Sequence, residues 1–183
     1  LDLLRRAALF HEPTRAFYFV RSESNRFLKN TEQMKQDLKS FEKTEATRAF
    51  DYYLPGHTAA WRGQRMKAIE SYKAALRLEP DHFQSLFFLA FRQMGTNPSI
   101  AAGLFRGCLA LRPDHIPSLR NFAIVLGKVG EFGEAHQQLN RAIKLGMGPE
   151  SHVNVLGGLS EAYQERANHQ QAVDMLTKAL AIA

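Results

Sequence analysis

The feature that most constrains the fold of this chain is a pattern of small and bulky residues that returns about every 34 residues. In its clearest copy, Ala68, Tyr72 and Ala75 stand at positions i, i+4 and i+7, which share one face of an α-helix. The same spacing begins again at Ala101, Ala135 and Ala172. Alternation of small and bulky side chains lets a neighbouring helix approach closely. The repeat therefore predicts an all-α protein in which each unit buries its apolar face against its neighbours.

A second helical pattern precedes each of these helices, which predicts two antiparallel helices in every repeat. Gly63, Gly130 and Asn168 stand at the junctions inside three pairs. Such residues tolerate the positive φ that ends one helix and lets the next begin. The sequence has no sustained alternation of period two and no Asn-Gly hairpin turn, so it predicts no β-sheet.

The unit Gly63-x4-Ala68-x3-Tyr72-x2-Ala75-x4-Pro80 resembles the tetratricopeptide repeat (TPR), whose period is about 34 residues. This resemblance implies a right-handed superhelical solenoid of antiparallel helix pairs, with about five pairs plus an N-terminal half repeat. It implies a single domain over residues 1–183. Residues 49–82, 83–115, 116–149 and 150–183 form the clearer repeats, and residues 1–48 form divergent ones.

Two segments, AALRLEPDHFQSLFFLAF and CLALRPDHIPSL, also resemble the TPR arrays attached to large bacterial serine/threonine kinases and related signalling proteins. The chain itself contains no Gly-rich phosphate loop, no His-Arg-Asp and no Asp-Phe-Gly. The resemblance therefore implies the regulatory arm of a bacterial signalling protein, without kinase activity of its own.

One departure from the repeat is Pro55, which falls inside the expected first helix of its pair. A proline in a helix interior costs roughly 3 kcal/mol, because it removes one hydrogen bond and its ring clashes with the preceding turn. We therefore expect a bend or a fresh helix start at Pro55.

The N-terminal part departs more broadly. Met34-x3-Leu38-x2-Phe41 is a weak copy of the repeat, and Ala8-x4-Pro13 has the spacing of the tail of a further unit. Neither end of the chain looks like a polar cap, although repeat arrays need one. We therefore expect a fragment of a longer protein, or an array whose ends (Leu1 to Phe10 and Thr177 to Ala183) are covered by another chain.

In TPR proteins the first helices of the pairs line a concave surface that usually holds a partner segment. The candidate groove residues are those of the first helices that packing between pairs does not use. They are Phe50, Tyr53, His57, Gln84, Phe87, Phe91, Met94, Arg120, Asn121, Ile124 and Lys128, with Asn154, Glu161 and Gln164 in the last pair. An aromatic side chain can bury about 150 to 250 Å² against a partner. The alternative is that Phe87 and Phe91 only pack inside the array.

Some TPR proteins bind a C-terminal carboxylate through Lys and Asn residues on successive first helices. Only Arg120 with Asn121 resembles part of that arrangement, and the matching places hold Phe87, Phe88, Gly157 and Gly158. We therefore expect a hydrophobic peptide or helix as the bound segment.

Catalytic chemistry is not visible in the sequence. Cys108 takes the small-residue place of its helix, which predicts a buried thiol, and a single cysteine permits no internal disulfide. The seven histidines show no metal-ligand spacing. Glu131 and Glu134 stand at a helix start, where carboxylates complement the helix dipole. The sequence predicts no enzyme, no metal and no cofactor.

The chain has a net charge of +6, to which residues 1–113 contribute +7 and residues 114–183 contribute −1. A basic field would favour an acidic partner or a nucleic acid. The leading prediction is a non-catalytic scaffold that binds a peptide or helix of a partner protein. Two alternatives stay open: a helical-repeat nucleic-acid binder, and a module that self-associates through its uncapped ends. No membrane span is predicted, and a cytoplasmic location is expected, with any N-terminal signal outside this chain.

Overall fold

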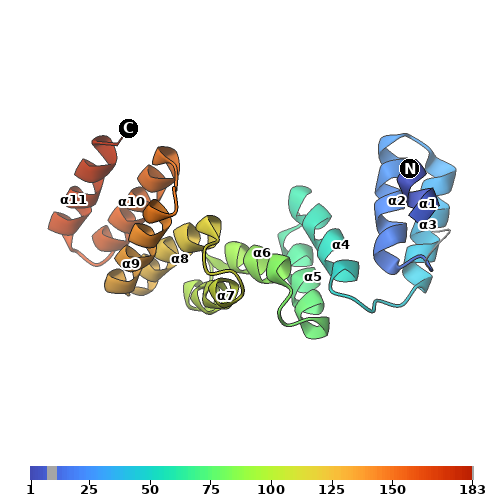
Figure 1. The fold of residues 1–183 in the computed structure, drawn as a ribbon, viewed down its shortest axis with the longest axis horizontal. Helices are drawn as coiled ribbons and strands as arrows, with labels where there is room; N and C mark the ends of the chain where they lie inside the picture. Colours follow the sequence, from blue (N-terminus) through green and yellow to red (C-terminus); the bar gives the residue numbers. More distant parts are fainter. Residues whose placement is uncertain (8–11, 183) are drawn as a thin grey trace. The chain divides into compact units, whose positions relative to one another are not determined.

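The computed structural model describes residues 1–7 and 12–182, and within these ranges all eleven regular elements are α-helices (Figure 1). The predicted all-α fold of helix pairs is therefore confirmed. The expected N-terminal helix from Leu1 to Phe10 is described as α1 only over Asp2–Ala7. Residues 8–11, which include the start of the Ala8-x4-Pro13 spacing, lie outside the described residues. So does Ala183.

Two compact units, residues 1–85 and residues 86–183, make up the chain, and their boundary falls inside α6. The N-terminal unit holds α1, α2 (Arg15–Phe27), α3 (Thr31–Lys43), α4 (Phe50–Trp61), α5 (Arg65–Leu78) and the start of α6 (Phe83–Gln93). The C-terminal unit holds the rest of α6, α7 (Pro98–Leu111), α8 (Ile116–Val129), α9 (Phe132–Lys144), α10 (Pro149–Gln164) and α11 (His169–Leu180). The single domain over residues 1–183 stays a prediction.

In the N-terminal unit, α2 packs on α3, α4 packs on α5, and α2 also contacts α4. Two buried carboxylates join these helices. Asp37 of α3 is fully buried and accepts hydrogen bonds from Arg21 and Asn25 of α2. Asp51 of α4 accepts hydrogen bonds from the main-chain N–H of Ala16, at the start of α2, and from two N–H groups just before α4. Buried charges are stable only when they are paired in this way.

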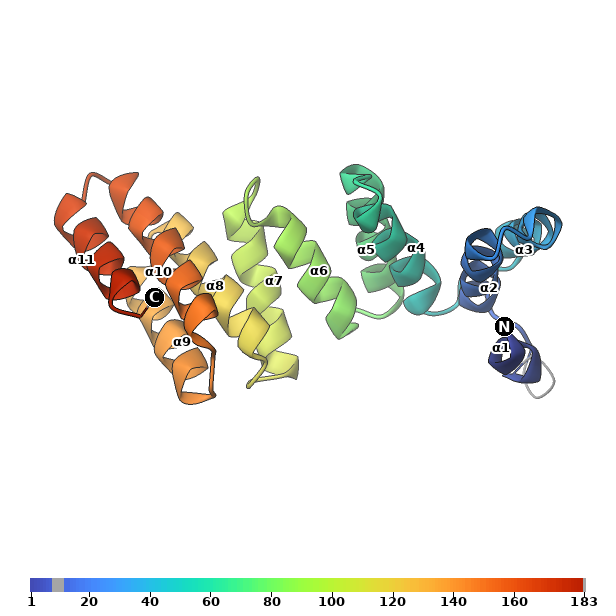
Figure 2. The same cartoon turned by 90° about the horizontal axis from the view of Figure 1, so that it is seen from above.

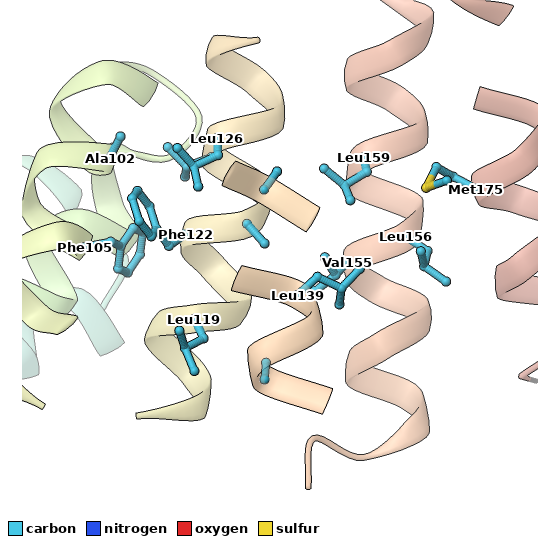
Figure 3. Close-up of a cluster of buried hydrophobic side chains, with 14 of the residues drawn as sticks. Ala102, Phe105, Leu119, Phe122, Leu126, Leu139, Val155, Leu156, Leu159 and Met175 are labelled. Atoms are coloured by element: carbon cyan, nitrogen blue, oxygen red, sulfur yellow. The ribbon is translucent and has the colours of Figure 1, made fainter. Parts of the chain in front are cut away.

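The C-terminal unit has the larger continuous core (Figure 3). Phe105 of α7 and Phe122 of α8 lie side by side in it, and Leu159 of α10 and Met175 of α11 continue it across the later helices. Contacts of α8 with α7, α9 and α10 place α8 at the centre of this unit (Figure 2). The repeat pattern forms most of this core, because Ala101, Phe105, Ala135 and Ala142 are fully buried. The last copy departs from the pattern, since Leu176 is 43% exposed and the neighbouring Met175 is buried in its place.

The turns inside the pairs follow the prediction at two of three places. Gly63 has a φ of +73° and Gly130 has a φ of +92°, as expected for left-handed residues that end a helix. The prediction for Asn168 is wrong. The left-handed residue of that turn is Ala167, with a φ of +55°, and Asn168 instead caps α11 by accepting a hydrogen bond from the N–H of Gln171.

The helix α4 runs from Phe50 through Pro55 to Trp61, so the expected fresh start at Pro55 is wrong. Pro55 lies past the first turn of α4, so its missing N–H removes one regular hydrogen bond, to the carbonyl of Asp51. Gly56 follows it, and a Cβ built on Gly56 would lie 2.6 Å from the Cβ of Ser71 in α5. Close packing of α4 on α5 therefore holds this part of α4 in a helix.

Candidate functional site

Three candidate groove residues lie on α4, and they differ in exposure. Tyr53 is buried, and its ring stacks on His57 at 5.5 Å and contacts Tyr72 of α5 at 6.1 Å between centroids. Burial raises the pKa of the Tyr53 hydroxyl. Phe50 is 44% exposed, and its ring meets His82 at 4.8 Å. Tyr53 thus contributes to packing of the N-terminal unit, whereas Phe50 leaves part of its ring open to contact.

Four candidates lie on α6. Gln84 and Met94 are partly buried, and Met94 packs against the core of the C-terminal unit. Phe87 is also partly buried, with its ring 6.0 Å from Phe105 and 5.3 Å from His115. Phe91 is 45% exposed, with the guanidinium of Arg92 over its ring. The structure thus places Phe87 in packing contacts and leaves Phe91 accessible.

Four more candidates lie on α8. Arg120, Ile124 and Lys128 are partly buried, and Asn121 is only 3% exposed. The Oδ1 atom of Asn121 accepts a hydrogen bond of 3.2 Å from Nε of Arg120. The Nδ2 atom of Asn121 is buried and has no hydrogen-bond partner among the described residues. Such an unsatisfied donor costs about 1 to 3 kcal/mol.

On the neighbouring helix α10, two adjacent glycines differ in how closely they pack. A Cβ built on Gly158 would lie 3.1 Å from the side chain of Ile124, whereas one built on Gly157 would meet nothing within 4 Å. The three further candidates of α10, Asn154, Glu161 and Gln164, are exposed. The first helices of this unit therefore combine an open apolar ring, an unsatisfied amide donor and free space.

The N-terminal unit contains a cavity of about 530 Å³ that the sequence did not predict. It lies between α2 and α4 and is lined mainly by Phe19, Val20, Phe27, Leu28, Leu54 and His57. Most of these residues belong to the divergent part of the chain, where the repeat spacing gives no register. One sequence signal could have indicated the cavity. It is the apolar pair Phe27-Leu28 at the end of a helix, just before the polar pair Lys29-Asn30.

The titratable side chains serve the structure. His115 caps α8, because its Nδ1 accepts a hydrogen bond from the N–H of Ser118, and His82 bonds Ser85 in the same way. Burial lowers the pKa of both histidines. Cys108 is fully buried as predicted, and burial raises the pKa of its thiol to about 11. A thiol of this kind is a poor nucleophile at neutral pH.

Among residues 1–7 and 12–182, no three His, Cys, Asp or Glu side chains gather closely enough to hold a metal ion. In the same described ranges, each helix is too short or too polar to cross a lipid bilayer.

No family model matches this chain, and no curated protein matches it in sequence. Solved structures do match it. YrrB, described as a TPR protein with an unusual peptide-binding site, aligns with a TM-score of 0.75 and 17% identity over 98% of this chain and 91% of its own. A MamA protein aligns with a TM-score of 0.70 and 18% identity over 94% and 93%.

MamA from Desulfovibrio magneticus RS-1, beginning at residue 41 of that protein, also aligns, with a TM-score of 0.68 and 17% identity over 92% of this chain and 94% of its own. The chain therefore has the fold of a TPR protein, as its repeat predicts. The likeness to the arrays of bacterial kinases stays a prediction.

Proposed function

We propose that this chain is a non-catalytic scaffold that binds a segment of a partner protein on the face formed by the first helices of its C-terminal unit. The TPR fold supports a role in protein interaction, and YrrB, with the same fold, is described as having a peptide-binding site. A regulatory arm in a signalling protein is the setting that the sequence resemblance favours.

The observation that carries this proposal is the apolar ring of Phe91, which is 45% exposed on the first helix α6. The Nδ2 atom of Asn121 on α8 is buried and unpartnered, so it would bond a main-chain carbonyl of a bound peptide only after the Asn121 side chain turns outward. Ile124, one turn later on α8, and the exposed ring of Phe91 on α6 offer apolar contacts. A donor next to apolar side chains is the usual composition of a site that orients a bound chain.

The test is selection of binding peptides from a random displayed library, followed by fluorescence anisotropy with the selected peptides. We expect the Asn121→Ala and Phe91→Ala variants to lose at least about tenfold in affinity, as is common for interface anchors. Asn140→Ala, an exposed residue of α9, is the matched control and should bind like the parent. Selected peptides that bind both variants as tightly as the parent would remove this face from the proposal.

Removal of the Asn121 amide should lower the free energy of unfolding only modestly, because it deletes the bond that Oδ1 accepts from Arg120 but also the unsatisfied Nδ2 donor. Circular dichroism should therefore still show a folded, helical variant. An affinity loss that accompanies a loss of helical signal would indicate a structural role for Asn121 instead.

The two alternatives have separate tests. A nucleic-acid binder would lose affinity steeply with added salt. Arg21 on α2 is paired with Asp37, and Arg62, just after α4, is paired with Glu23. These ion pairs make both arginines less available to phosphates. Self-association would appear as a mass that rises with concentration in light scattering.

A further inference from the structure

The cavity of about 530 Å³ between α2 and α4 has the size of a ligand-binding site. Phe19, Val20 and Leu54 form apolar walls, and Ser24, His57 and Thr58 supply the polar atoms. A volume of this size accommodates several apolar side chains together. Few polar groups among apolar walls are typical of pockets that bind apolar anchors in a fixed orientation.

Large apolar side chains stand exposed around the mouth of this cavity. Phe27 is 88% exposed and Leu28 is 59% exposed at the end of α2, and both also line the cavity. At the end of α4, Trp61 is 83% exposed, and its indole N–H donates a hydrogen bond of 3.2 Å to His57. Exposed apolar side chains grouped beside a cavity usually mark a surface that a partner covers.

The rim of the cavity is basic. Glu23 is the acidic residue of the lining, and it is paired with both Arg26 (3.2 Å) and Arg62. Two guanidinium groups on one carboxylate leave an excess positive charge, and the exposed Lys29 adds another beside Leu28. A segment that carries carboxylates around its apolar side chains would therefore be attracted to this rim.

We propose that the cavity between α2 and α4 binds the bulky apolar side chains of an acidic, amphipathic segment of a partner protein. The proposal rests on the proposed function and names the chemistry of the partner. The apolar walls are recessed between two helices, so they fit inserted side chains better than a flat lipid surface. The basic rim then selects partners by charge, and Trp61 and Phe27 cover the inserted residues.

The experiment uses two fluorescein-labelled helical peptides with the same Leu and Phe positions. In one peptide the polar positions are Glu, and in the other they are Lys. Trp61 is the sole tryptophan of the chain, so its emission reports occupation of the cavity directly. We expect the acidic peptide to bind at least about tenfold more tightly than the basic one, to shift the Trp61 emission, and to weaken with added salt.

The variant Ser24→Leu places a larger side chain in the cavity wall and should weaken binding of the acidic peptide at least about tenfold. The matched control is Ser99→Leu on the exposed surface of α7, which should bind like the parent. If Ser24→Leu lowers the unfolding midpoint, Phe27→Ala replaces it, because a side chain that is 88% exposed contributes little to folding. Binding that persists in Ser24→Leu and in Phe27→Ala would overturn the proposal, as would equal affinity for the two peptides.

Two further outcomes separate this inference from the proposed function. In the first, binding of the library peptides depends on Asn121 and Phe91 but not on Ser24 or Phe27. This result would show that the cavity is not the binding site, and it would leave the scaffold function standing. In the second, the parent binds phosphatidylserine vesicles, Phe27→Ala does not, and the acidic peptide does not bind. This result would assign the exposed apolar side chains to membrane binding and overturn the proposal. If no peptide binds the parent, both proposals fail together.

Discussion

The guanidinium of Arg166, at the end of α10, donates a hydrogen bond of 2.7 Å to the main-chain carbonyl of Lys128, at the end of α8. The last carbonyls of a helix have no partner within the helix, so this bond satisfies one of them. The same guanidinium lies over the ring of Phe132 at 5.6 Å and against Gly130, where a Cβ would come within 3.1 Å of Nε. One side chain thus joins the ends of two first helices to the turn between α8 and α9.

Replacement of Arg166 by Ala should lower the free energy of unfolding by about 1 kcal/mol, because a charge-assisted hydrogen bond and a ring contact are lost at a half-open site. The control Arg141→Ala removes an exposed ion pair with Asp114, which is worth at most about 0.5 kcal/mol. Urea unfolding followed by circular dichroism measures both. Equal effects of the two substitutions would show that the contact with Lys128 contributes nothing.

Ala167, next to Arg166, has a φ of +55°, which an L-residue with a Cβ adopts at a cost of about 1 kcal/mol or more. Ala167→Gly should therefore raise the free energy of unfolding by up to about 1 kcal/mol. The same change at the exposed Ala110, inside α7, should lower it by roughly 0.5 to 1 kcal/mol. A thermal unfolding midpoint that falls in Ala167→Gly would contradict the left-handed backbone at this residue.

This turn also illustrates what the sequence could and could not predict. The small-residue anchors such as Ala101 and Ala135 and the glycine turns at Gly63 and Gly130 follow from the spacing alone, because helix geometry fixes which residues share a face. The junction before α11 did not follow, because Ala carries no local signal for a left-handed conformation. Asn168 has two common uses at a helix end, and here it is the cap.

Contacts between distant residues were beyond the sequence for a different reason. The bond between Arg166 and Lys128 and the cavity around Phe19 depend on how separate helices approach one another, and no repeat spacing encodes that distance. Among the candidate groove residues, spacing placed Tyr53 and Phe91 alike on first helices. Their exposure differs because the packing of each first helix covers its face unevenly.

Asp51 provides a second long-range contact with a measurable effect. It is 2% exposed, and its two oxygens accept three main-chain hydrogen bonds of 2.7 to 2.9 Å, one of them from Ala16 at the start of α2. Asp51→Asn replaces an acceptor by a donor that faces N–H groups, so it should lower the free energy of unfolding by roughly 2 to 3 kcal/mol.

Trp61, in the same helix, reports unfolding of the N-terminal unit by its fluorescence. The control Glu32→Gln changes an exposed carboxylate of α3 and should have little effect. An unchanged unfolding curve in Asp51→Asn would mean that water can replace the carboxylate at all three N–H groups.

Acid should weaken the caps that His115 and His82 provide. Nδ1 of His115 accepts a hydrogen bond of 3.3 Å from the N–H of Ser118, which only the neutral ring can do. Burial and the nearby Arg112 lower the pKa of His115 in the folded state, so the neutral form is favoured by folding. This contribution to stability is complete above the unfolded pKa of about 6.5 and is lost as the pH falls through that value toward the lower folded pKa.

The variant His115→Asn tests this assignment, because Asn also caps helices well but does not titrate. Between neutral pH and a pH about one unit below the unfolded value of about 6.5, the parent should lose more unfolding free energy than His115→Asn. The ring of Phe87 packs on His115 and is unchanged in the variant, and the other titrating groups are common to both proteins. The difference in pH dependence between parent and variant therefore belongs to this imidazole, and equal slopes would mean that His115 stays neutral throughout or that protonation leaves the cap intact.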